Sequence, residues 1–349
     1  MSIIVTGGAG FIGSNFLNLL VPRHPELRFI NVDKLGYASN LANLAALEAL
    51  PNYCFVQLDI TDASAVEALF EAEQVELVVH FAAESHVDRS IRSPLPFIES
   101  NIRGTFNLLE AFRAFGKGER RRFHHVSTDE VYGSLGAEGL FTETTAYDPS
   151  SPYSASKAAS DHLVRAWGRT YGIPFTISNC SNNYGPHQFP EKLIPLMILN
   201  ASEGKPLPIY GKGLNVRDWL YVDDHCEAIW TIIERGREGE TYNIGGNAER
   251  TNLEVVREIC RLVAAHLGRP VEELEALLSY VPDRPGHDLR YAIDASKIAE
   301  ECGWRPRESF PSGLEKTVRW YLEHPEWVES VRSGDYRQWM NTHYGEGKA

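Results

Sequence analysis

The chain has 349 residues, 43% of them hydrophobic, and a formal net charge of -13 at pH 7. A chain of this length and composition can bury a substantial core, which excludes a disordered protein or a short disulfide scaffold. The negative charge argues against a protein that binds nucleic acid irrespective of its sequence or attaches to an anionic membrane, because both need a large basic surface.

The first residues have the pattern of a dinucleotide-binding unit. Residues 3–6 are mostly apolar and predict a short buried strand, which leads directly into Gly7, Gly10 and Gly13 at GxxGxxG spacing. Glycines at this spacing permit a tight turn, a close approach of a pyrophosphate and packing of the following helix. That helix is predicted by apolar side chains at helical spacing, namely Phe16, Leu17, Leu19 and Leu20.

A second apolar run, residues 29–32, predicts the next strand and ends in Asp33. An acid about twenty residues after the glycines binds the adenosine ribose hydroxyls in dinucleotide-binding units. Its carboxylate would repel the 2′-phosphate of NADP, so we predict NAD as the cofactor despite the neighbouring Lys34. The alternative is that Asp33 is an ordinary turn residue.

Strands and helices alternate in the following part of the chain. Apolar runs predict strands at 53–58, 77–81 and 123–127, and helical patterns lie at 63–71 and 97–115. This alternation predicts an α/β fold with a doubly wound parallel sheet of the Rossmann type, which binds its nucleotide at the carboxyl ends of the strands. Asp59 and residues 82–86 fall at that edge, where we interpret His86 as a structural residue rather than a catalytic one.

Two adjacent acids follow the strand at 123–127. Thr128, Asp129 and Glu130 stand at its carboxyl end, where a ligand is expected, so a chemical role is favoured over a role in solubility. Tyr153 and Lys157 follow on a predicted helix, where their spacing puts them on one face. The ammonium of Lys157 would lower the pKa of the phenol and make Tyr153 a usable base. A solvated helix face is the alternative for such a pair taken alone.

Residues 175–180 predict a further strand, and residues 182–186 predict an irregular crossing into a second lobe. In this lobe Lys192, Arg217 and Arg284 offer isolated positive groups that can hold a diphosphate in an acidic protein. Each of the three can equally be an ordinary surface charge.

The chain begins MSIIVTGG, without the features of a targeting leader, and has no apolar run long enough to cross a bilayer. These observations predict a cytoplasmic protein. The five cysteines are scattered and odd in number, with no CxxC pair, which favours reduced thiols over disulfides and predicts no metal site.

Ten segments extend these observations along nearly the whole chain. They are GGAGFIGS, VDKL, AAESHVDRSI, STDEVYG, PYSASKA, SNNYGP, PEKLIP, PIYGKG, VRDWLYVDD and DRPGHD. In their order and spacing the sequence resembles the extended short-chain dehydrogenase/reductase family, and most closely its dTDP-glucose 4,6-dehydratase members. The resemblance implies a tightly bound NAD, dTDP-glucose as substrate, and dTDP-4-keto-6-deoxyglucose and water as products, for the synthesis of deoxysugars such as rhamnose.

The resemblance also implies a role for each residue at the reacting carbons. Tyr153 and Lys157 would oxidise C4 of the sugar together with NAD, while Thr128 contacts the C4 oxygen. The C4 ketone acidifies C5, so Glu130 would remove the C5 proton while Asp129 protonates the departing C6 hydroxyl. Hydride would then return from NADH to C6, with no net consumption of cofactor.

Binding residues follow from the same resemblance. Those implied for the cofactor are Gly7, Gly10, Phe11, Ile12, Gly13, Asp33, Lys34, Asp59, Ile60, Ala82, Ala83, Ser85, Ser100, Ser127, Tyr153, Lys157 and Asn183. Those implied for the sugar nucleotide are Ser85, Thr128, Asn182, Lys192, Leu193, Pro208, Tyr210, Arg217, Asn252, Arg284 and His287. The chain departs from the family at Gly36, where members commonly have threonine, so a hydroxyl contact to the adenosine phosphate is in doubt.

A domain arrangement and a homodimer are further expectations. The NAD-binding domain would cover residues 1–186, with segments near 216–250 returning to it. A mainly sugar-nucleotide-binding lobe would cover 187–330, followed by a tail at 331–349. Helices near 97–115 and 152–171 would pack across a two-fold axis, although their apolar residues can equally face only the sheet.

Three other functions are compatible with this fold. A nucleotide-sugar 4-epimerase needs only Tyr153 and Lys157, a decarboxylating uronate enzyme is a second rival, and a non-catalytic dinucleotide-binding protein needs only the glycines. None of the three accounts for both Asp129 and Glu130, which therefore favour the dehydratase.

Overall fold

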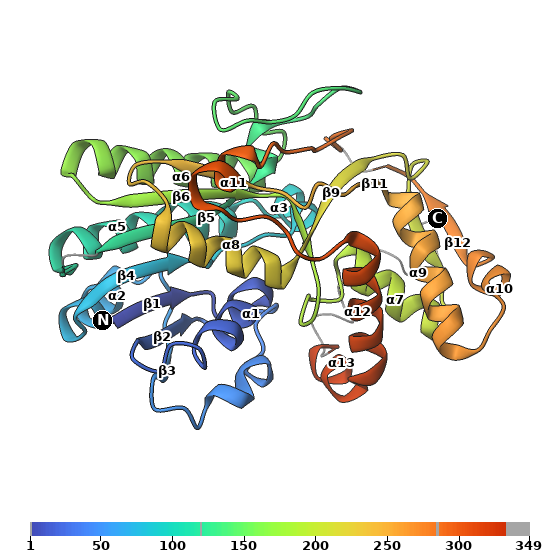
Figure 1. Ribbon diagram of the computed structural model, residues 1–349, viewed down its shortest axis with the longest axis horizontal. Helices are drawn as coiled ribbons and strands as arrows, with labels where there is room; N and C mark the ends of the chain where they lie inside the picture. The colour runs from blue at the N-terminus through green and yellow to red at the C-terminus, as the bar shows by residue number, and fades with distance from the viewer. Residues whose placement is uncertain (1, 119–120, 284–285, 333–349) are drawn as a thin grey trace.

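The computed structural model describes residues 2–118, 121–283 and 286–332. Its main element is a parallel sheet of seven strands in the order β10-β6-β5-β4-β1-β2-β3 (Figure 1). The strands are β1 (Ser2–Thr6), β2 (Arg28–Asp33), β3 (Tyr53–Gln57), β4 (Val75–His80), β5 (Arg122–Thr128), β6 (Phe175–Cys180) and β10 (Thr241–Ile244). From β1 the strand order runs outward to β3 and then continues on the other side of β1 with β4, so the switch point lies between β1 and β4, which confirms the predicted Rossmann-type topology.

Helices cover both faces of this sheet because both faces of its strands are apolar. On β1, Ile3 and Val5 pack into one cluster with α1 (Phe11–Leu20) and α8 (Val222–Arg235), whereas Ile4 packs into the cluster on the other face. Side chains alternate across a strand, so an uninterrupted apolar run serves two cores at once. The opposite face is covered by α2 (Ala63–Ala72), α5 (Gly104–Phe115) and α6 (Pro152–Tyr171).

The helix predicted at 97–115 is confirmed, but part of it has π-helical hydrogen bonding. It consists of α4 (Leu95–Phe97), a π-helical segment η2 (Ile98–Arg103) and α5. Within η2 the side chain of Asn101 accepts a hydrogen bond from the Glu84 backbone amide at 2.8 Å and donates to the Glu84 carbonyl at 3.0 Å. A π-helical turn often marks a functional site, and this one ties the helix to the loop after β4.

A second departure concerns the crossing at 182–186, which was predicted as irregular. Residues 182–184 form a short strand, β7 (Asn182–Tyr184), which pairs in parallel with β9 (Val216–Tyr221). The sequence NNYGP has the composition of a turn. Its first three residues are extended because they pair with β9, which lies more than thirty residues later in the sequence.

The C-terminal part forms its own core at the right of Figure 1. It contains α7 (Leu193–Glu203), β8 (Leu207–Tyr210), β11 (Glu249–Thr251), α9 (Asn252–Leu267), α10 (Val271–Glu275), β12 (Leu278–Val281), α12 (Phe310–Glu323) and α13 (Pro325–Val331). Between β9 and β11 the chain returns to the large sheet through α8 and β10, and α11 (Ser296–Cys302) later packs on α8. The domain boundaries given above remain a prediction, and all but the first two residues of the tail lie outside the described residues.

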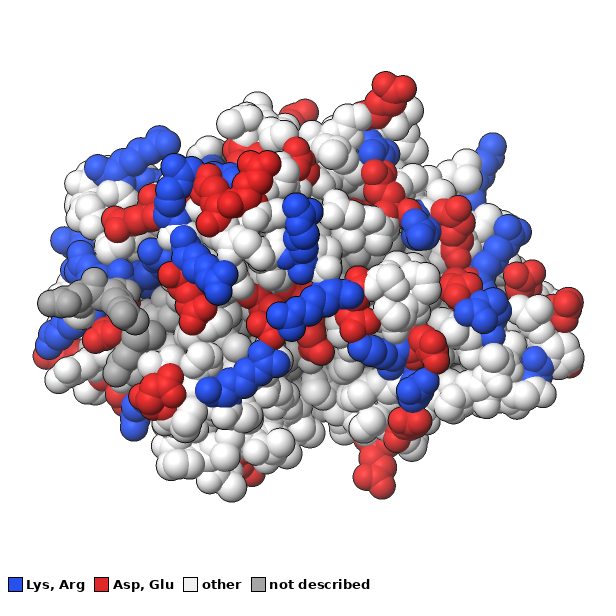
Figure 2. Space-filling model, viewed as in Figure 1, with Lys and Arg blue, Asp and Glu red and all other residues white. Residues whose placement is uncertain are grey.

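On the face shown in Figure 2, lysine and arginine side chains are interspersed with aspartate and glutamate. Across the described ranges, no helix is both long and apolar enough to span a bilayer.

Candidate active site

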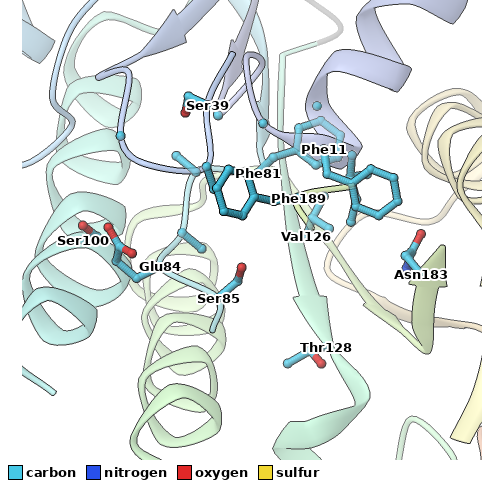
Figure 3. A pocket seen from close by; sticks show the side chains of 18 of the residues that line it. Phe11, Ser39, Phe81, Glu84, Ser85, Ser100, Val126, Thr128, Asn183 and Phe189 are labelled. Carbon is cyan, nitrogen blue, oxygen red and sulfur yellow. The ribbon is translucent and has the colours of Figure 1, made fainter. Parts of the chain in front are cut away.

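A cavity of about 320 Å³ lies along the carboxyl ends of the large sheet. This volume falls within the usual range for a small-molecule site. Its lining includes all seventeen residues that the sequence predicted for the cofactor and all five predicted for catalysis. Figure 3 shows Glu84, Ser85 and Ser100 along one wall, Asn183 across from them and Thr128 at the end of β5.

The glycine loop leaves no room for side chains. Gly7 has φ +73°, and a Cβ on it would lie 2.7 Å from the amide nitrogen of Ala82, which follows β4. A Cβ on Gly13 would lie 2.4 Å from the carbonyl oxygen of Gly7. The glycines therefore let the loop pass close to the backbone that follows β4. The loop lines the cavity at the N-terminus of α1, where backbone N–H groups favour a pyrophosphate. These residues fit a dinucleotide.

Gly7→Ala is expected to lose bound NAD and to destabilise the fold by about 1 to 3 kcal/mol, because the methyl group would overlap the backbone of Ala82. Gly136→Ala is the matched control, since a Cβ there would meet nothing within 4 Å and Gly136 lines neither cavity described below. The NAD content of the purified proteins and their thermal unfolding measure both effects. Equal NAD content in the two variants would contradict the role of the glycine loop.

Asp33 is held at the far end of the same cavity. One carboxylate oxygen accepts from the Ala9 amide at 3.0 Å, and the other accepts from the Leu35 amide at 2.8 Å and the Ser39 hydroxyl at 2.9 Å. Its neighbour Lys34 lies 4.0 Å from Asp59 and 3.5 Å from Glu84. Since the carboxylates of Asp59 and Glu84 offset this ammonium, the surroundings of Asp33 favour the adenosine ribose hydroxyls of NAD over the 2′-phosphate of NADP.

The two acids at the end of β5 differ in environment. Asp129 lies in η3 (Asp129–Tyr132) and is only 2% exposed, and its Oδ2 has no hydrogen-bond partner among the described residues. Burial and the charges of Glu130 and Asp218 raise the pKa of the Asp129 carboxyl well above its ordinary value. Thr128 joins the pair, because its hydroxyl lies 3.4 Å from Asp129 Oδ1 and accepts from the Glu130 amide at 3.3 Å. Asp129 is therefore suited to hold a proton.

Tyr153 and Lys157 both line the cavity from α6, whose N-terminus is capped by Ser151. The prediction that Lys157 lowers the pKa of Tyr153 is not met in this structure. Burial and the Glu130 charge raise the pKa of Tyr153 well above its ordinary value. The Lys157 ammonium donates instead to the carbonyl of Val126 at 2.8 Å, and burial lowers its own pKa. The shared helix face was a correct prediction, but a buried phenol beside a carboxylate needs further positive charge to ionise.

A second cavity adjoins the first, and Glu130, Asn182, Glu191 and Lys192 line both. Its lining includes these residues predicted for the sugar nucleotide: Asn182, Lys192, Leu193, Pro208, Tyr210, Arg217, Asn252 and His287. Ser85 and Thr128 line the first cavity, and Arg284 lies outside the described residues.

The positive groups of this second cavity are not isolated, contrary to the prediction. The guanidinium of Arg217 donates to the carbonyls of Val216 at 2.7 Å and Asp288 at 2.9 Å, and it lies over the Tyr291 ring. The ammonium of Lys192 donates to the Ser85 carbonyl at 2.9 Å. Backbone carbonyls therefore orient both cations before any ligand binds.

Glu191 lines both cavities and was missed from the sequence. Its buried carboxylate accepts from the Tyr37 hydroxyl at 2.9 Å and from Arg89 at 3.3 Å, and Arg89 lies over the Tyr37 ring. The signal was present in the segment PEKLIP, where an acid stands beside the predicted Lys192 and Leu193.

Comparisons with known proteins agree with this geometry. A family described as GDP-mannose 4,6 dehydratase matches residues 4–317. A dTDP-glucose 4,6-dehydratase from Shigella flexneri is 55% identical over the full length of both chains. Crystal structures of dTDP-glucose 4,6-dehydratases with NAD bound, from Bacillus anthracis and Streptomyces venezuelae, are each 47% identical with TM-scores of 0.85 and 0.87. They cover 95% of this chain, and the matches span 99% and 100% of those chains. The chain belongs to the dTDP-glucose 4,6-dehydratase family.

Proposed function

We propose that this protein converts dTDP-glucose into dTDP-4-keto-6-deoxyglucose and water. The observation that carries the proposal is the pair Asp129 and Glu130, which stands beside Tyr153 where the two cavities meet. The first cavity fits a dinucleotide, and the second has oriented cations for a diphosphate.

The cofactor supported by the glycine loop and by the relatives solved with NAD is NAD, which supplies an acceptor for the C4 hydrogen of the sugar and a donor for C6. Tyr153 takes the proton of the C4 hydroxyl, while Thr128 lies beside it to contact the C4 oxygen. Lys157 contributes positive charge beneath the cofactor site. Burial and the Glu130 charge still raise the pKa of the phenol in the structure, so its ionisation would depend on the further positive charge of a bound nicotinamide ring.

The elimination step needs two carboxyl groups in opposite protonation states. C6 carries a poor leaving group, so Asp129 gives its proton to the departing hydroxyl. Glu130 takes the C5 proton, which the neighbouring ketone has made acidic, and returns a proton to C5 when C6 is reduced. The contrast between a buried Asp129 and a partly exposed Glu130 supports this division of roles.

Incubation of the NAD-loaded protein with dTDP-glucose tests the proposal. A dehydratase yields the 4-keto-6-deoxy sugar nucleotide, which mass spectrometry detects as the loss of one water. An epimerase yields dTDP-galactose, and a dinucleotide-binding protein without catalysis leaves the sugar unchanged. Either of the last two results would overturn the proposal.

We also propose a homodimer that forms through the helices near 97–115 and 152–171. Exposed apolar side chains gather on these helices and on α3 (Val87–Arg92), namely Ile91, Leu95, Ile98, Phe106 and Tyr171. Apolar patches of this kind support an interface between copies of one chain. A cytoplasmic location is part of the same proposal, and the five free cysteines are compatible with a reducing compartment.

Leu95→Glu is expected to turn the dimer into a monomer, because it places a charge in the proposed interface, where Leu95 is 65% exposed. Leu214→Glu is the control, since Leu214 is also exposed but lies in the loop before β9. Sedimentation equilibrium measures the change. A monomeric wild type, or equal dissociation of both variants, would contradict the proposed interface.

A further inference from the structure

Three ionisable side chains are buried together beneath the first cavity. Lys157 is 4% exposed, and His125 and Asp161 are fully buried. Lys157 and Asp161 stand four residues apart on α6, so they share one face of the helix, and His125 faces them from β5. Only Lys157 has a role in the reaction proposed above.

The imidazole of His125 lies between the other two groups. Its Nε2 is 3.5 Å from the ammonium nitrogen of Lys157 and 3.2 Å from Oδ1 of Asp161. The contact with Lys157 is the hydrogen bond, because Oδ1 of Asp161 has no hydrogen-bond partner among the described residues, so Nε2 accepts from the ammonium and the imidazole proton lies on Nδ1. The Asp161 carboxylate also accepts from the Ser127 hydroxyl at 3.0 Å and from the Tyr147 hydroxyl at 2.8 Å.

The negative charge of the Asp161 carboxylate balances the positive charge of the Lys157 ammonium. Burial alone would raise the pKa of Asp161, but the neighbouring His125, the charge of Lys157 and the hydrogen bond of Tyr147 hold it below its ordinary value. Burial lowers the pKa of Lys157, and the Asp161 charge opposes that effect. Burial and the Lys157 charge lower the pKa of His125 to about 4, so the imidazole is neutral near pH 7. A buried ammonium needs such a compensating charge.

Other titratable groups around Lys157 come from every neighbouring element. They are His80 on β4, Cys180 on β6, Tyr153 and Arg165 on α6, and Tyr147 in the preceding loop. Among these described neighbours Asp161 is the carboxylate that the structure brings to His125.

We propose that Asp161 and His125 are positioning residues, which hold the ammonium of Lys157 in place below the cofactor and supply its compensating charge. The inference rests on the proposed function, in which Lys157 serves the oxidation at C4. Neither residue touches the substrate. Both act through Lys157.

The neighbouring His124 provides a matched control. It is also fully buried on β5, but it faces the other side of the sheet, where its ring nitrogens lie 2.9 Å from the Thr176 hydroxyl and 3.1 Å from the Ser178 hydroxyl. A purely structural loss of a buried imidazole would therefore affect His124→Gln and His125→Gln alike.

The experiment compares Asp161→Asn, His125→Gln and His124→Gln. The substrate is dTDP-6-deoxyglucose, which lacks the C6 hydroxyl, so only C4 oxidation is followed, through the absorbance of the reduced nicotinamide. We expect Asp161→Asn and His125→Gln to oxidise it about 10 to 100 times more slowly, as expected when a group that orients a functional side chain is lost. Without the Asp161 charge the pKa of Lys157 falls further, so the alkaline decline in rate begins at a lower pH. His124→Gln keeps the wild-type rate and pH profile.

Calorimetric titration of the apoproteins with NAD gives a second readout that does not depend on turnover. Asp161→Asn and His125→Gln should bind NAD about tenfold more weakly, whereas His124→Gln should not. If Asp161→Asn fails to fold, His125→Gln decides. Unchanged rates, pH profiles and NAD affinity in the folded variants, or equal losses in His124→Gln, would overturn the inference. If the wild type oxidises no sugar, the proposed function fails, while the NAD titration still tests the pair.

Discussion

Asp129→Asn is expected to retain oxidation at C4 and to lose the elimination of water. An amide has the shape of the protonated carboxyl but cannot donate the proton that the C6 oxygen requires. A positioned general acid contributes about 100- to 10,000-fold to a rate, so turnover should fall by that factor. Rapid mixing with dTDP-glucose should show the reduced nicotinamide forming and persisting, because the keto sugar cannot proceed.

Glu130→Gln should produce the same block from the other side, because the amide cannot remove the C5 proton. Glu143→Gln is a suitable control, since burial also raises the pKa of Glu143 but it accepts from the Asn243 amide and lies outside both cavities. Full dehydratase turnover by Asp129→Asn or Glu130→Gln would refute the assigned roles.

The raised pKa of Asp129 predicts the direction of a pH effect on the wild type. Asp129 must be protonated to act, and burial and its acidic neighbours raise its pKa, so it stays active at pH values where an ordinary carboxyl is ionised. The elimination rate should therefore decline as the pH rises through this raised pKa. An elimination rate that does not decline toward alkaline pH would contradict the assignment.

Tyr153→Phe is expected to abolish the reaction at its first step. Phenylalanine fills the same buried space but cannot accept the C4 hydroxyl proton, so C4 oxidation should slow by about 100- to 10,000-fold. The variant should still contain NAD, and no reduced nicotinamide should form after mixing with dTDP-glucose. This result differs from that of Asp129→Asn, in which the reduced form accumulates.

Tyr132→Phe is the control for Tyr153→Phe, because it removes a buried hydroxyl that does not act as the base. Tyr132 is also buried, and its hydroxyl donates to Asn243 at 2.8 Å outside both cavities. Its replacement should cost about 1 kcal/mol of stability and leave turnover intact. Comparable rates of C4 oxidation in Tyr153→Phe and the wild type would exclude Tyr153 as the base.

The large sheet could be predicted from the sequence because its signals are local. Residues 3–6 and the glycines after them gave the first strand, the turn and the helix in one stretch of chain. The π-helical segment η2 and the strand β7 could not be predicted, because each depends on a distant partner. Asn101 reaches the loop at Glu84, and β7 needs the edge of β9.

The candidate site shows the same contrast between local signals and features that depend on distant partners. Asp129, Glu130, Tyr153 and Lys157 stand in short motifs, so their presence at one cavity could be predicted. The orientation of Lys157 could not, because it depends on the Val126 carbonyl, on His125 and on Asp161. Glu191 was missed for a related reason, since its partner Tyr37 comes from the loop after β2 and its partner Arg89 from α3.

The most direct test of the account follows a deuterium atom placed at C4 of dTDP-glucose. Because the C4 hydrogen is proposed to leave and return within one site, the account predicts that the label reaches C6 of the same sugar molecule. Mixing labelled with unlabelled substrate distinguishes this transfer from exchange between molecules. A product without deuterium at C6, or with deuterium distributed among molecules, would contradict it.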